Sequence, residues 1–174
     1  MKIIEKPKGG EFAPNASMYI DLLPDDGLVL RYLKENFEAA KKLILPLPEE
    51  KLLYRYAVGK WTIKEILAHI IDDERIYCYR ALRFARKDKT PLPGFEQNDY
   101  VPHSSANGRD LSNIFTEYEA VRNSTVAFYN GLEDAALQRA GVADGNPMSV
   151  RASAYHIAGH ELHHINFIKK HYLE

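Results

Sequence analysis

The chain of 174 residues has a single cysteine, no long apolar run and no excess of either charge. Cys78 therefore has no partner for an internal disulfide, and its place on an apolar helix face indicates a core residue. No stretch approaches the roughly 20 apolar residues of a membrane span, and residues 1–12 lack the apolar core of a secretory signal. We therefore expect a cytoplasmic protein that does not enter a membrane. Lys and Arg number 23 and Asp and Glu 24, which argues against nucleic acid as a partner.

Helical periodicity dominates the sequence, and no segment alternates convincingly like a strand. Thr62 and Glu65 form a capping-box pattern at the start of the second helical segment, and Asp110 is a natural N-cap for the third. Four amphipathic helices of about 20 residues each predict an all-α four-helix bundle. We expect the helices at about 24–45, 62–87 and 110–132, and from 146 or 149 to the C-terminal end.

The longest connection, residues 88–109, carries neither helical nor strand signals. Connections longer than about 12–15 residues are usually functional or disordered. We therefore expect a lid or crossover packed over one end of the bundle, with side chains that shape the substrate side. Residues 1–23 are expected to form an N-terminal extension ahead of a bundle domain at 24–174. Within the 88–109 connection, the side chains expected to shape the substrate side are Phe95, Asn98, Asp99, Tyr100 and His103.

Histidine is concentrated near the C-terminal end, where four of the seven lie within nine positions. His160 and His164 are one helical turn apart, so both imidazoles can reach one metal ion. Two histidines alone make a labile site, and His69 in the middle of the second helix is the best third ligand. An imidazole without a partner is unfavourable inside a bundle. We therefore predict a metal site at His69, His160 and His164, the alternative being hydrogen-bonded core histidines.

Two other metal patterns occur in the same helix. His160 to His164 matches H-E-x-x-H of zinc proteases, but those enzymes take a further ligand downstream and only ten residues remain. Glu161 and His164 match the Glu-x-x-His pair of di-iron bundles, which need a second pair that is not found. Both interpretations are disfavoured. We expect His156, one turn before His160, to support the site or to pack in the core, and Asp72 or Asp73 to hydrogen-bond an imidazole.

One pair of opposite charges falls on apolar helix faces. Glu74 projects from the centre of the stripe of the second helix, and Arg122 lies on the core stripe of the third. An unpaired buried charge costs roughly several kcal/mol, so each of these two side chains needs a partner. We predict a buried Glu74–Arg122 bridge that sets the register of the two helices; the alternative is that one side chain reaches water.

Two motifs resemble those of a known family. The order W-T-x-x-E-x-x-x-H-I-x-D-x-E at 61–74 and H-I-x-x-H-E-x-x-H at 156–164 resembles the DinB/YfiT-like metalloprotein superfamily, from about Asp26 onward. The resemblance implies a four-helix bundle with up-down-down-up connectivity and a metal triad at His69, His160 and His164. It also implies that the protein is a homodimer, as many members are. The reactions of the family include transfer of low-molecular-weight thiols such as mycothiol or bacillithiol.

The combined interpretation is a metal-dependent enzyme with an open three-histidine site. We expect it to transfer a low-molecular-weight thiol to an electrophilic small-molecule substrate, because a divalent ion with an open position lowers the pKa of a bound thiol or water. The alternatives are a metal-dependent hydrolase and a non-catalytic metal-binding stress-response protein. Zinc or nickel is the expected ion, with iron or manganese as further options. No residue stands out as a general base; Glu161 and Asp73 are the candidates.

Overall fold

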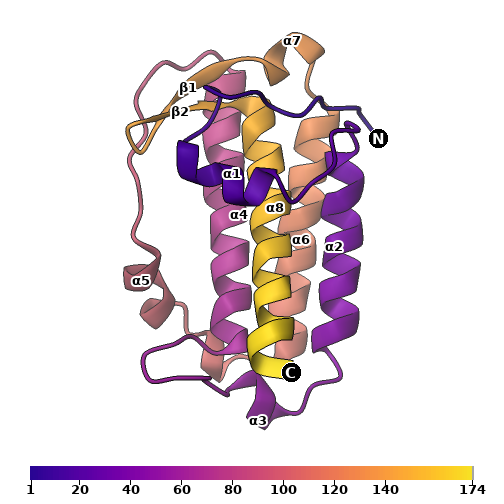
Figure 1. Cartoon of the computed structure of the whole chain (residues 1–174), viewed down its shortest axis with the longest axis vertical. Coiled ribbons are helices and arrows are strands. Elements are labelled where there is room, and N and C mark those ends of the chain that lie inside the picture. The colour runs from indigo at the N-terminus through magenta and orange to yellow at the C-terminus, as the bar shows by residue number, and fades with distance from the viewer. Residues whose placement is uncertain (174) are drawn as a thin grey trace.

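The computed structural model describes residues 1–173 and shows four long helices packed side by side (Figure 1). These are α2 (Val29–Ile44), α4 (Ile63–Ala85), α6 (Leu111–Asn130) and α8 (Val150–Ile168). A π-helical turn, Lys169–Leu173, continues α8. The predicted all-α four-helix bundle is therefore confirmed. Within residues 1–173, no helix combines the length and apolarity needed to cross a membrane.

The directions of the four helices explain the long connection between α4 and α6. Figure 1 shows α4 and α6 running in one direction and α2 and α8 in the other, which is the up-down-down-up order. Since α4 and α6 are parallel, residues 86–110 have to return along the full length of the bundle, and they do so on its outside (Figure 1). The expected crossover is confirmed, but its expected position over one end of the bundle was wrong.

The crossover contains local structure that its sequence did not indicate. It includes α5 (Gln97–Tyr100) and the 3-10 turns η2 (Val101–His103) and η3 (Ala106–Gly108), and Leu92 forms a parallel bridge with Ala143. The sequence therefore carries no signal for these elements, although the structure contains them. Each of these elements is a single turn or a single residue pair, which is too short to show a helical or strand period.

The N-termini of the helices confirm some of the capping signals. At α4, Thr62 Oγ1 accepts a hydrogen bond from the Glu65 amide (3.1 Å), and Glu65 Oε2 accepts one from the Thr62 amide (2.8 Å), which is the predicted capping box. Ser149 caps α8, so the alternative start at residues 146–147 was wrong. α2 begins at Val29 instead of residue 24, because Gly27 adopts a positive φ of 75°.

A short β-hairpin at the end of the bundle was not expected. β1 (Ala140–Ala143) and β2 (Asn146–Ser149) pair antiparallel between the single-turn helix α7 (Asp134–Leu137) and α8. Asp144 and Gly145 form its turn with φ angles of 52° and 71°, the left-handed conformation that a two-residue hairpin turn requires. The hairpin corrects the prediction that the chain has no strand.

Residues 1–23 lie against the bundle, with α1 (Ser17–Ile20) directly on α8 (Figure 1). Ile4 is fully buried, and its carbonyl oxygen accepts a hydrogen bond from Tyr155 Oη (2.9 Å). α1 packs so closely on α8 at Gly159 that a Cβ atom on this residue would lie 2.2 Å from the Tyr19 carbonyl oxygen. The N-terminal segment is thus part of the packed structure around the middle of α8.

The buried apolar side chains form two clusters, one toward each end of the bundle. The cluster near α1 and the hairpin includes Leu33, Phe84 and Tyr155, and the other includes Phe37, Leu67 and Ile165. Between them along α4 and α8 lie buried polar side chains that include His69 and His160, with the partly buried His164 beside them. The fold therefore places a polar layer across the middle of an otherwise apolar core.

Candidate metal centre

The three predicted ligands meet in this polar layer. His160 Nε2 lies 3.0 Å from His69 Nε2 and 3.1 Å from His164 Nε2. His69 comes from α4 and the other two from successive turns of α8, so the antiparallel packing of these two helices brings the rings together. His69 and His160 are buried, and His164 is partly buried.

Hydrogen bonding alone does not account for this convergence. A single ring nitrogen carries either one proton or one lone pair, so His160 Nε2 cannot make two good hydrogen bonds to two other imidazole nitrogens. Nitrogens bound about 2.0–2.1 Å from one ion, at angles of about 90–110°, lie about 2.9–3.4 Å apart. The observed spacings fall in this range, and the donor set suits a divalent ion of the zinc or nickel type.

The surroundings keep the three rings in the form that binds metal. Burial lowers the pKa of His69 and holds that of His160 well below its ordinary value. Burial also lowers the pKa of His164, to about 3. A neutral imidazole offers a lone pair, whereas a protonated one does not, so these pKa values favour metal ligation near neutral pH.

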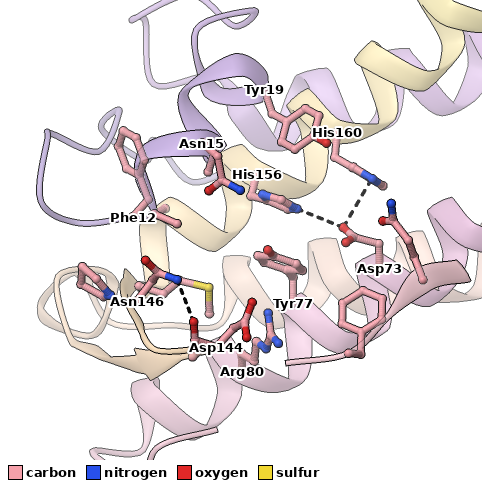
Figure 2. Close-up of a pocket in the computed structure, with 18 residues that line it drawn as sticks. Phe12, Asn15, Tyr19, Asp73, Tyr77, Arg80, Asp144, Asn146, His156 and His160 are labelled. Atoms are coloured by element: carbon pink, nitrogen blue, oxygen red, sulfur yellow. Dashed lines mark hydrogen bonds and ion pairs between the residues drawn. The ribbon is translucent and has the colours of Figure 1, made fainter. Parts of the chain in front are cut away.

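Asp73 connects His160 with a fourth histidine. Its Oδ2 atom lies 3.4 Å from Nδ1 of His160 and 3.3 Å from Nε2 of His156 (Figure 2). Burial alone would raise the pKa of Asp73, but the neighbouring imidazoles of His160 and His156 hold it below its ordinary value. A carboxylate at Nδ1 favours a proton there and leaves the lone pair on Nε2, facing the other two rings. Asp72 instead lies 3.8 Å from Arg75.

Glu161, the other candidate base, takes part in a buried ion-pair network. Its carboxylate accepts a hydrogen bond from Tyr118 and lies 2.9 Å from Nη1 of Arg122. Arg122 also donates from Nη2 to Glu74 (2.8 Å) and from Nε to both oxygens of that carboxylate (3.1 Å each), so the predicted bridge is confirmed. Burial raises the pKa of Glu161 to about 7, against the opposing effect of Arg122. The sequence had not indicated that Glu161 joins the Glu74–Arg122 pair.

Two aromatic side chains cover the histidines. The Tyr19 ring lies 5.2 Å from the rings of His156 and His160, edge to face, and the Trp61 ring lies 5.0 Å from that of His69. Tyr19 comes from the segment that we expected to be an extension, and no sequence signal connected it with the histidines. Together the two rings restrict the access of water to the cluster.

Two cavities reach the histidine cluster from different sides. The first, of about 220 Å³, is lined by His160 and Asp73, and the second, of about 250 Å³, by His164 and Trp61. Gln97 of α5 lines both, so the crossover does border the site. Of the five loop side chains expected there, Phe95 lines the first cavity and Asn98 the second, whereas Asp99, Tyr100 and His103 line neither.

The fold and the cluster define a class of four-helix bundles with a parallel central pair and a buried three-histidine centre. The sequence model of the DinB superfamily matches residues 32–168, and the chain belongs to this superfamily. It is 27% identical over 125 residues, 71% of each chain, to a protein of Oceanobacillus iheyensis named "Putative metal-dependent hydrolase OB0413". It is also similar to the structure of YfiT from Bacillus subtilis, described as "a probable metal-dependent hydrolase with an unusual four-helix bundle topology". That similarity has a TM-score of 0.75 and 14% identity over 95% of this chain and 91% of YfiT, so it concerns the fold.

Proposed function

We propose that this protein is a divalent-metal-dependent enzyme whose ligands are His69, His160 and His164. The observation that carries the proposal is the convergence of three neutral imidazole nitrogens in a partly enclosed polar layer, with those of His69 and His164 lying 3.0 and 3.1 Å from that of His160 and all three within 4.8 Å of one another. A divalent ion held by three neutral ligands keeps its charge and an open position, and it lowers the pKa of a water or thiol there.

The other side chains of the site support the ligands and limit solvent. Asp73 orients His160 by favouring the proton on Nδ1. Tyr19 and Trp61 shield the cluster, which strengthens electrostatic interactions inside it. Glu161 is engaged with Arg122 and Tyr118, so Asp73 is the carboxylate that remains beside the histidines.

The first candidate reaction is hydrolysis with water as the nucleophile. The two relatives described above are both named for metal-dependent hydrolysis, which supports this choice. The first cavity, of about 220 Å³, reaches His160 and suits a compact substrate, since it lies below the usual range of drug-sized ligand sites.

The second candidate reaction is transfer of a low-molecular-weight thiol to an electrophile. The arrangement that favours it is the pair of cavities, since each one is lined by a different metal ligand. A reaction between two bound molecules needs two such approaches, whereas hydrolysis of one molecule needs only one. Zinc or nickel suits either reaction, because imidazole binds both ions well.

Metal content tests the site directly. Protein purified without a metal-affinity tag or added metal should contain about one divalent ion per chain by elemental analysis. The variant with His69, His160 and His164 changed to Ala should contain none, with an unchanged helical circular dichroism spectrum. His103→Ala is the matched control, because His103 lines neither cavity. Absence of metal from both proteins, even after reloading, would refute the proposal.

Turnover separates the two reactions. The metal-loaded protein should hydrolyse activated esters or amides if water is the nucleophile. If a thiol is the nucleophile, it should accelerate conjugation of cysteine-based thiols to 1-chloro-2,4-dinitrobenzene. The triple variant provides the baseline in both assays. Stoichiometric metal without turnover in either assay would favour a non-catalytic metal-binding protein.

A further inference from the structure

The cavity beside His160 contains a buried arginine with almost no protein partner. Arg80, on α4, is 5% exposed. Among residues 1–173 it donates one hydrogen bond, from Nη2 to the Pro93 carbonyl oxygen (2.9 Å), it lies close enough to Tyr77 to affect the pKa of that hydroxyl, and it forms no ion pair. A guanidinium has five N–H donors, so most of this donor capacity is not used by the protein. Within the described residues, none of its nitrogens is both fully buried and unpaired, so the unused N–H groups open onto the cavity.

Aromatic rings hold this guanidinium in place. Its central carbon lies 5.0 Å from the centre of the Tyr77 ring and 5.9 Å from that of Phe95. Tyr77 is in turn stacked on His156, with ring centres 3.6 Å apart and planes 7° apart (Figure 2). These contacts offset part of the cost of burial. They also fix the orientation of Arg80 before any ligand arrives, which reduces the entropy lost on binding.

The charged residues that line the cavity leave Arg80 without a carboxylate partner. Among the described residues that line it, Arg80 is the only lysine or arginine, and Asp73 at the other end is shared between His160 and His156. Asp144, an exposed residue of the hairpin turn, lies on the same side of the cavity as Arg80 (Figure 2) without forming an ion pair. Neither carboxylate forms an ion pair with Arg80, although Asp144 adds a negative charge to the same side of the cavity.

We propose that Arg80 binds a carboxylate of the substrate, so that the cavity takes small molecules with a carboxylate at one end and the reacting group at the other. A single planar guanidinium fits a carboxylate through two parallel hydrogen bonds. Arg80 and Asp73 are seven residues apart on α4, a rise of about 10 Å. Six-carbon acids span a distance of this order and serve as probes of the cavity. Only the identity of the reacting end rests on the proposed function.

Binding of the carboxylate can be tested without metal. Hexanoate added to the metal-free protein should shift the Nε–Hε resonance of Arg80 in a ¹H–¹⁵N spectrum and saturate it, whereas the neutral isostere hexanamide should not. Arg80→Met identifies the resonance by its loss. Arg83→Met, which removes an arginine paired with Asp88 on the same helix, is the matched control and should leave the titration unchanged. Asp144→Asn should tighten hexanoate binding, because it removes a competing negative charge near Arg80.

Binding at both ends is tested with the cobalt-loaded protein. The thiolate-to-cobalt absorption band should appear at lower concentrations of 6-mercaptohexanoate than of 6-mercapto-1-hexanol, by roughly 10- to 100-fold. Arg80→Met should remove this difference, and Arg80→Lys should restore only part of it. Equal shifts of Arg80 by hexanoate and hexanamide, or saturation by inorganic phosphate but not by hexanoate, would overturn the proposal. Saturation by hexanoate in a chain that binds no cobalt would support the carboxylate site and refute the metal site.

Discussion

Replacement of Arg122 by Met should destabilise the protein more than any exposed charge substitution. Arg122 is 2% exposed and neutralises two carboxylates from two different helices, Glu74 and Glu161. Methionine fills much of the space but leaves both carboxylates buried without a cation. Breaking a buried ion pair costs about 3–5 kcal/mol, and about 1 kcal/mol shifts Tm by about 2–4 °C in a domain of this size. We therefore expect Tm to fall by roughly 6–20 °C.

The measurement is urea unfolding at pH 7.5 followed by circular dichroism, with Arg31→Met as the control. Arg31 pairs with Glu35 on the exposed face of α2, so its removal should leave the stability nearly unchanged. A double-mutant cycle with Glu74→Gln should give a coupling of roughly 0.5–3 kcal/mol. A loss below about 1 kcal/mol for Arg122→Met, or no coupling, would refute the role of this network in holding α4, α6 and α8 together.

Three further substitutions test the site and the segment that covers it. Asp73→Asn should lower metal affinity about 10- to 100-fold in a chelator competition, and unchanged affinity would contradict its orienting role. Glu11→Gln should destabilise the protein at pH 7 by on the order of 1–2 kcal/mol. A hydrogen bond from Arg151 lowers the pKa of Glu11 from 4.5 to about 2. The difference in stability between Glu11→Gln and wild type should therefore be largest above pH 4.5 and vanish as the pH falls toward 2. A difference that does not depend on pH would refute the stabilising role of the Glu11 carboxylate. Gly159→Ala should expose residues 1–23 to trypsin, since its methyl group would collide with the Tyr19 backbone, and unchanged protection would show that α1 can shift at little cost.

The sequence was sufficient for the bundle and the histidine cluster because both depend on helical periodicity. Positions 160 and 164 face the same side of any helix, and a third histidine in the middle of another long helix reaches them once the two helices pack antiparallel. The Glu74–Arg122 bridge was predictable from the same helical periodicity, since it places each charge on an apolar helix face, where it needs a partner of opposite charge.

The features that were not expected from the sequence lie in segments too short to show a helical or strand period. The hairpin strands have four residues each, and β2 contains Pro147, so only the Asp144-Gly145 turn could have indicated it. The positions of Tyr19 and Gln97 beside the histidines depend on how nonhelical segments cross the bundle surface. That path is set by tertiary packing, such as the close contact at Gly159, and not by local propensity.

The contact between Trp61 and His69 makes the centre optically observable. Trp61 is the only tryptophan of the chain, and its ring lies 5.0 Å from that of His69. Ions with partly filled d shells, such as nickel, cobalt and copper, quench the fluorescence of a nearby indole, whereas closed-shell zinc does not. The unlabelled protein therefore carries an intrinsic reporter of which kind of ion occupies the site and how quickly it exchanges.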